Sequence, residues 1–260
     1  FKMAINLITS GCSFTAHKGC WPWWLIRKIK DNGYKQDLSL INNAVGGSDN
    51  QLIARKTIHA VNKLFKKHIE PKDIIVGVMW SGHNRKSFYS DDKLTLVGMF
   101  KGQDSKMPHK WPPNDRKGRW LLMTPNSALH GSYPEHWYKW LHSEPIAKAE
   151  TYEQILRVQW FLEKHKIKYF MQTHRKDLQN TYDSHPQVTY LKQMIDWSKF
   201  VNTSCYEWIK QNSKLSWTEY DDIRRLKRKP GDEHPTSYQQ QEYVEEVLWP
   251  FLIEKGIIDG

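Results

Sequence analysis

The sequence predicts an α/β fold, a sandwich of helices around a mainly parallel sheet. Short apolar runs alternate with amphipathic segments along most of the chain. That repetition of strand and helix is typical of a parallel sheet covered by helices. A chain of 260 residues can bury a core without disulfides. We therefore expect one domain over residues 1–260, with a single insertion at about 86–149.

Four apolar runs predict strands, at residues 4–10, 38–45, 73–80 and 167–173. The third run, DIIVGVMW, is continuously apolar after a Pro-Lys-Asp turn. A run of that kind indicates a strand that is covered on both faces. It is the clearest strand in the sequence.

Helices are predicted between and after these strands, at 21–33, from Ser48 to before Pro71, at 151–166 and at 236–254. In the second helix, spacings of three and four relate the apolar residues Ile58, Val61, Leu64 and Phe65, with Lys and Arg mostly opposite. This periodicity places the apolar side chains on one face, toward a core.

Between Lys86 and Ala149 the periodicity fades, and tryptophans stand among Pro, Gly, Asn and His. We interpret this segment as an insertion packed over one end of the sheet, partly helical at 134–142. Its tryptophans either stack on sugar rings or form the core of a segment with few aliphatic side chains. The sequence leaves both interpretations open.

Composition limits the classes of protein that fit. No apolar run reaches the roughly 20 residues needed to span a bilayer. The start, FKMAINLITSG, lacks a charged leader and a cleavage site, and it predicts a buried strand rather than a signal peptide. Three cysteines without CxxC spacing fit a reducing compartment. We expect a cytoplasmic or virus-associated protein that makes no membrane contact.

Polar loops follow the first three strands, and a fourth precedes the last helix: GCSFT (11–15), NNAVGGSDN (42–50), WSGHNR (80–85) and GDEHP (231–235). In parallel sheets, sites gather beyond the carboxyl ends of the strands. Acyl transfer needs a hydroxyl nucleophile, N–H donors for an oxyanion, and an imidazole base held by a carboxylate. The four loops offer these residue types.

In this order, the four loops resemble the signature blocks of the SGNH hydrolases, also called GDSL esterases or lipases. The resemblance implies a flavodoxin-like three-layer α/β/α sandwich with a parallel sheet of about five strands. It implies Ser13 as nucleophile and His234 as base, oriented by Asp232. It also implies an oxyanion hole formed by the Ser13 N–H, the Gly47 N–H and the Asn84 amide.

Three features depart from the family pattern. Cys12 stands where the family usually has Asp, and Arg85 follows the Asn where Asp is common. Only Glu233 separates the Asp and the His of the last block, where the family has two residues. Gly46 also competes with Gly47 for the oxyanion position.

The expected substrate is a small acyl ester or an acylated, anionic saccharide, which makes a carbohydrate O-deacetylase a specific form of this hypothesis. The run RRLKRK at 224–229 is a peak of positive charge ahead of the base, and it would attract an anion. Around the reacting groups, we expect Trp80, His83, Arg85 and Arg228 to contact the substrate.

No cofactor or metal is expected, because no HExxH motif or glycine-rich phosphate loop is present. His130, His136 and His142 recur every six residues, which scatters them around a helix. One alternative is a catalytically weak SGNH-like module that binds or assembles, for example in a phage or viral particle. The other is a nucleic-acid-binding protein, but nucleic acid is not the expected partner, because only the net charge of +11 indicates it.

Overall fold

A computed structural model describes residues 5–33, 38–90, 119–125, 132–178, 185–215, 220–221, 226–227 and 233–258 of the chain. Its main sheet consists of β1 (Ile5–Ser10), β2 (Leu38–Asn42), β3 (Ile74–Trp80) and β6 (Lys168–Thr173). All pairs in this sheet are parallel, and the strand order is β2-β1-β3-β6. The four predicted strands are therefore confirmed.

The strand order makes the sheet doubly wound, since the chain moves outward from β1 in both directions. The fifth strand that the flavodoxin-like fold predicts is reduced in the described residues to a single parallel bridge between Met171 and Phe200. There the Val201 N–H donates to the Met171 carbonyl at 2.9 Å. The predicted fold is confirmed, with four strands in place of about five.

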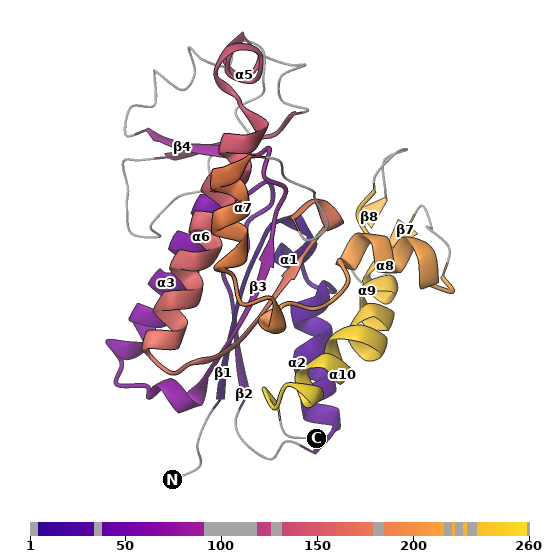
Figure 1. Ribbon diagram of the computed structural model, residues 1–260. Helices are drawn as coiled ribbons and strands as arrows, with labels where there is room; N and C mark the ends of the chain where they lie inside the picture. The colour runs from indigo at the N-terminus through magenta and orange to yellow at the C-terminus, as the bar shows by residue number, and fades with distance from the viewer. Residues whose placement is uncertain are drawn as a thin grey trace.

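Helices cover both faces of the sheet (Figure 1). On one face lie α3 (Asn50–Phe65), α6 (Glu144–Lys164) and α7 (Pro186–Gln193). On the other lie α2 (Trp21–Asp31), α8 (Cys205–Asn212), α9 (Ser237–Tyr243), a π turn (Val244–Leu248) and α10 (Trp249–Glu254). The described residues also include short 3-10 turns (Pro71–Asp73, Lys176–Leu178, Trp197–Lys199) and a small pair of strands, β7 (Tyr220–Asp221) and β8 (Leu226–Lys227).

The apolar side chains form two cores, one on each face of the sheet. Successive residues of β3 alternate between them, because side chains of a strand point to opposite faces. Val76 and Trp80 join the core under α3 and α6, whereas Ile75 and Met79 join the core under α2. Gly77 leaves room for two aromatic rings, since a Cβ there would overlap Phe170.

The segment at 86–149, predicted as an insertion, contains two strands and a short helix among its described residues. β4 (Lys86–Ser90) pairs antiparallel with β5 (Arg119–Met123), and the helix α5 (Ser132–His136) runs into a π turn (Trp137–Leu141). The helical stretch predicted at 134–142 is thus present. Helix α6 begins at Glu144, earlier than Thr151 where its apolar periodicity becomes visible. Proline in its first turn and few apolar side chains there conceal this start.

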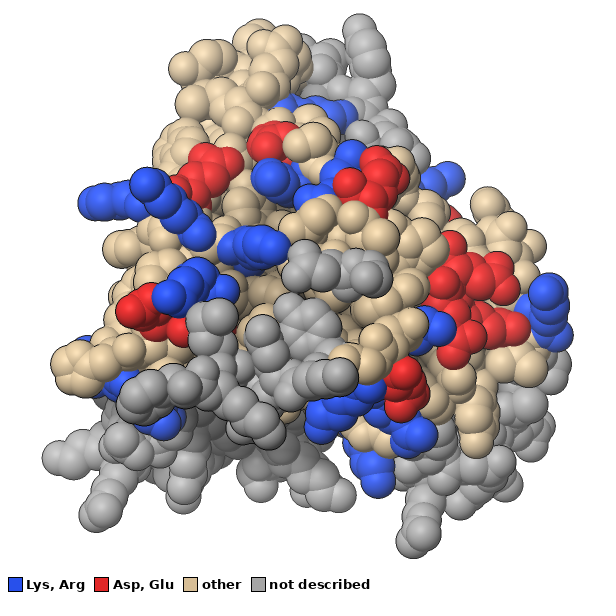
Figure 2. Space-filling view, turned by 90° about the horizontal axis from the view of Figure 1, so that it is seen from below, with Lys and Arg blue, Asp and Glu red and all other residues tan. Residues whose placement is uncertain are grey.

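The described surface carries both signs of charge. Figure 2 shows Lys and Arg beside Asp and Glu on the face seen from below. No described helix is long and apolar enough to cross a membrane.

Candidate active site

Ser13 stands on a tight turn at the carboxyl end of β1. Strand β1 ends at Ser10, and Ser13 is the first residue of the short helix α1 (Ser13–Ala16). Between them, Gly11 has no room for a side chain, because a Cβ would overlap Thr15 and lie 3.1 Å from the Met79 carbonyl oxygen. As the first residue of a helix, Ser13 has an N–H without an acceptor inside that helix.

His234, from the loop before α9, contacts Ser13. The distance between Ser13 Oγ and His234 Nε2 is 2.7 Å, within the range that a nucleophile and its base require. The His234 ring also packs on Phe14, with ring centroids 5.1 Å apart. Directly after Pro235, a capping box fixes the start of α9: Thr236 N–H donates to the Gln239 side chain at 2.9 Å, and Gln239 N–H donates back to Thr236.

The groups that flank His234 are only partly described. Asp232, expected to orient the imidazole, and Arg228 lie outside the described residues. Glu233 accepts hydrogen bonds from Arg175 and from Tyr206 Oη, and the Arg175 guanidinium lowers the pKa of its carboxyl. Glu233 therefore anchors the loop that carries the base.

The loop after β2 lies against the loop after β1. The Val45 N–H donates to the Gly11 carbonyl at 3.1 Å. Gly47 adopts a φ of +78°, a backbone conformation that favours glycine. A Cβ on Gly46 would lie 3.9 Å from Ser13 Cβ, while Gly47 lines the same cavity as Ser13. Gly46 adjoins the serine and Gly47 lines its cavity, so either glycine can supply the second N–H donor.

Asn84 extends from the loop after β3. That loop is tied to the start of α3, because the Asn50 side chain accepts from Ser81 N–H at 2.8 Å and donates to its carbonyl at 3.0 Å. The Asn84 side-chain oxygen is 2.9 Å from His142 Nε2, and Tyr138 Oη donates to the Asn84 backbone carbonyl at 2.6 Å. Within the described part of the chain, the Asn84 amide N–H₂ has no acceptor.

A cavity of about 650 Å³ brings these groups together. It is lined, among others, by Ser13, Gly47, Asn84, Arg85, His174 and His234. A hydroxyl in contact with an imidazole, beside N–H donors and a cavity, is the arrangement that acyl transfer needs. The resemblance implies the same side chains, and the fold places them at one edge of the sheet.

His174 and Arg175 line the cavity as well, although the sequence analysis did not select them. His174 follows β6 directly, and its ring meets Phe14 edge-on with centroids 5.3 Å apart. Burial, reinforced by Arg85 and Arg175, holds the pKa of His174 well below its usual value. Its position after the fourth apolar run was the available signal, the same one that selected Ser13 and Asn84.

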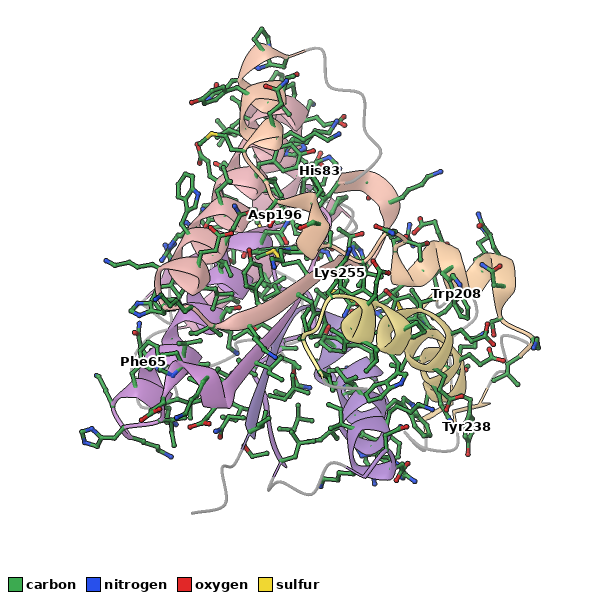
Figure 3. All side chains as sticks on the ribbon, turned by 60° about the horizontal axis from the view of Figure 1, so that its bottom comes forward. Phe65, His83, Asp196, Trp208, Tyr238 and Lys255 are labelled. Carbon is green, nitrogen blue, oxygen red and sulfur yellow. The ribbon has the colours of Figure 1, made fainter. Side chains whose placement is uncertain are left out.

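Trp80 and His83 do not line this cavity, so the expectation that they contact the substrate is corrected. Trp80 is fully buried on the α3 and α6 face of β3, and its Nε1–H donates to Met171 Sδ at 3.3 Å. His83 is 7% exposed and lies beside α6, 3.7 Å from Glu144 (Figure 3). Gly82, Asn84 and Arg85 of the same loop line the cavity, whereas His83 lies toward Glu144 of α6.

Among the described residues, no three His, Cys, Asp or Glu side chains gather as a metal site would require.

Residues 10–258 match a family described as a family of unknown function (DUF6071). The chain belongs to this family. The match includes Ser13, Asn84 and His234 of the DUF6071 chain. No curated protein matches its sequence.

Several solved structures are similar to this DUF6071 chain. TesA is 11% identical, with a TM-score of 0.47 over 97% of this chain and 99% of TesA. LAE5, an alpha/beta hydrolase enzyme from the metagenome of Lake Arreo, Spain, is 13% identical, with a TM-score of 0.46 over 98% of this chain and 97% of LAE5. The acetyl xylan esterase AlAXEase is 12% identical, with a TM-score of 0.42 over 95% of this chain and 98% of AlAXEase. These likenesses transfer no substrate to this chain, whose chemistry depends on its own residues.

Proposed function

We propose that this chain is a serine hydrolase of the SGNH type, which cleaves an ester or removes an O-acyl group. One observation carries the proposal: Ser13 Oγ lies 2.7 Å from His234 Nε2, and both line a cavity that also holds Asn84. The two residues come from opposite ends of the chain, so their contact is a property of the fold.

In the proposed mechanism, His234 Nε2 accepts the Ser13 proton as the hydroxyl oxygen attacks the acyl carbon. The negative charge that develops on the carbonyl oxygen is stabilised by the Ser13 N–H, a glycine N–H and the Asn84 amide. His234 then returns the proton to the leaving alcohol. Water, activated by the same imidazole, attacks the acyl-enzyme and releases the acid.

The proposed substrate is a small acyl ester or an acylated, anionic saccharide. With an acetylated saccharide as substrate, the enzyme would be a carbohydrate O-deacetylase. Arg85 and Arg175 both line the cavity. Arg175 is neutralised by Glu233, whereas Arg85 has no carboxylate partner among the described residues. A guanidinium without a partner favours a carboxylate or a similar anion on the substrate.

The test is covalent labelling with a fluorophosphonate, which reacts with activated serines. We expect one modified peptide, carrying the label on Ser13, and no labelling of the His234→Ala variant. Labelling on another serine, or none in the folded wild type, would contradict the proposal. Turnover of p-nitrophenyl acetate that depends on Ser13 is the matching kinetic assay.

A catalytically weak binding module is the second candidate. Two departures from the SGNH pattern favour it: Cys12 replaces the usual Asp, and only one residue separates Asp232 from His234. A folded wild type that neither labels nor turns over esters would favour it. The nucleic-acid alternative still depends on the net charge of +11, and the face shown in Figure 2 mixes both signs. A salt-dependent gel shift with mixed DNA would support it.

A further inference from the structure

Thr124 and Pro125 of the Trp-rich insertion line the cavity, and the helical part of the insertion contacts Asn84. Two hydrogen bonds arrive from the π turn and its following residue: His142 Nε2 meets the side-chain oxygen at 2.9 Å, and Tyr138 Oη meets the backbone carbonyl at 2.6 Å. The Tyr138 and His142 rings also contact each other, with centroids 5.3 Å apart. Backbone and side chain of Asn84 are therefore held from the same turn.

We propose that the insertion completes the oxyanion hole, with His142 and Tyr138 as positioning residues that keep the Asn84 amide N–H₂ directed to the reacting oxygen. This inference rests on the proposed hydrolase function. It gives the insertion a role in the chemistry in addition to any contact with substrate.

The reason is the polarity of an amide. Its N–H₂ end stabilises a developing oxyanion, whereas its oxygen end would repel one, and the two ends have nearly the same shape. A donor fixed on the oxygen removes the wrong orientation. A hydrogen bond of this kind favours the arrangement that contains it about fivefold.

His142 can perform this task only with a proton on Nε2. The neutral ring protonated on Nε2 and the cation both carry that proton. Burial lowers the pKa of His142, Lys86 adds to this, and Glu144 and Glu150 oppose it. Since both states donate from Nε2, the positioning should not change as His142 titrates.

The π turn that precedes His142 is anchored to strand β4. Trp137 packs edge-on against Phe88 of β4, with ring centroids 5.2 Å apart, and Lys86 Nζ lies 5.6 Å from the Trp137 ring. Lys86 also forms an ion pair with Glu150 of α6 at 2.7 Å. The turn that carries Tyr138 and precedes His142 is therefore held against β4, and β4 is tied to α6 through Lys86.

The experiment is a double-mutant cycle on ester turnover, using His142→Leu, His142→Gln and Asn84→Ala. Gln places an N–H near the position of His Nε2, so it is the conservative control. We expect His142→Leu to lower kcat about fivefold with KM within about twofold, and His142→Gln to recover most of the loss. In the Asn84→Ala background, His142→Leu should have no further effect, because it acts through that amide. Tyr138→Phe should have a smaller effect in the same direction.

Losses that multiply in the double variant, or a His142→Gln enzyme as slow as His142→Leu, would overturn the inference while leaving the hydrolase intact. The inference would also be overturned if His142→Leu lowered kcat only on one side of the pH at which His142 titrates. A folded wild type that neither hydrolyses esters nor reacts with the fluorophosphonate overturns the proposed function and this inference together.

Discussion

The site is built from two regions that differ in how the fold fixes them. Ser13 and Asn84 follow β1 and β3, neighbouring parallel strands whose register pairs Ser10 with Val78. Their relative position is determined by the sheet, because both strands end at the same edge. Tyr138 and His142 come from the insertion and meet the site through hydrogen bonds with Asn84. In the proposed reaction, the first region supplies the nucleophile and the oxyanion amide, and the second orients that amide.

Variants of the two regions should differ in stability and in rate. A reacting group at a strand end can be removed with little loss of stability, because its side chain points into a cavity rather than into a core. The residues that orient it change the rate by less, and only through their partner.

Ser13→Ala should lower the rate of p-nitrophenyl acetate hydrolysis by about 10⁴-fold or more, because removal of the nucleophile leaves only the weaker contributions of binding and the oxyanion hole. The matched control is Ser10→Ala, which removes a buried hydroxyl from the same strand end without touching the reaction. Steady-state kinetics of both variants decide the point. Equal losses in the two variants would show that the strand end itself, and not the Ser13 hydroxyl, is required.

Asn84→Ala should lower kcat by about 10²- to 10³-fold, the usual effect of removing one oxyanion donor. Stability should fall by about 1 kcal/mol, since one hydrogen bond with His142 is lost. Urea unfolding of the variant beside its kinetics separates the two effects. A large loss of stability with unchanged kcat would make Asn84 a structural residue.

The two regions also differ in how far the sequence predicts them. The apolar runs identify all four strands of the sheet, and the polar residue after each of the first and third runs, Ser13 and Asn84, lies in the cavity. His234 could be selected only through the resemblance, because no local pattern brings the C-terminal loop to β1. Trp80 and His83 show the limit of proximity in sequence: Trp80 points into the core under α3 and α6, and His83 lies beside Glu144 of α6. Tyr138 and His142 carry no periodicity that indicates their partner, since a tertiary contact alone creates their role.

Asp232→Asn should lower the esterase rate at least about tenfold, if Asp232 orients the imidazole despite the short step to His234. Proline after His234 favours an extended conformation, which leaves residues two apart on the same side. The matched control is Glu233→Gln, because Glu233 is held by Arg175 and should affect the rate less. Full activity in Asp232→Asn would show that another group holds the base.

Arg85→Gln should discriminate between substrates rather than stop the reaction. For the anion 4-acetoxybenzoate, we expect KM to rise about fivefold to tenfold, the effect of losing a charge-assisted contact of about 1 kcal/mol. For the neutral 4-acetoxybenzamide, of almost the same shape, KM should stay within about twofold. Equal changes for both esters would mean that Arg85 supports the loop and does not read charge.

His174 tests the contrast from the other side, because it stands at a strand end but is buried and packed against Phe14. Burial holds the pKa of His174 well below the usual 6.5, so the unfolded chain binds more protons than the folded one below that pH. Stability should therefore fall as the pH falls below about 6.5, by up to about 1.4 kcal/mol per pH unit for this one group. His174→Phe keeps the ring and removes the titration, so its urea-unfolding free energy should depend less on pH between 7 and 5 than that of the wild type. His59→Phe, at an exposed position of α3, is the matched control and should keep the wild-type dependence. If His174→Phe kept the full dependence as well, the acid sensitivity would belong to other groups, with His83 the first to examine because its pKa is lowered in the same direction.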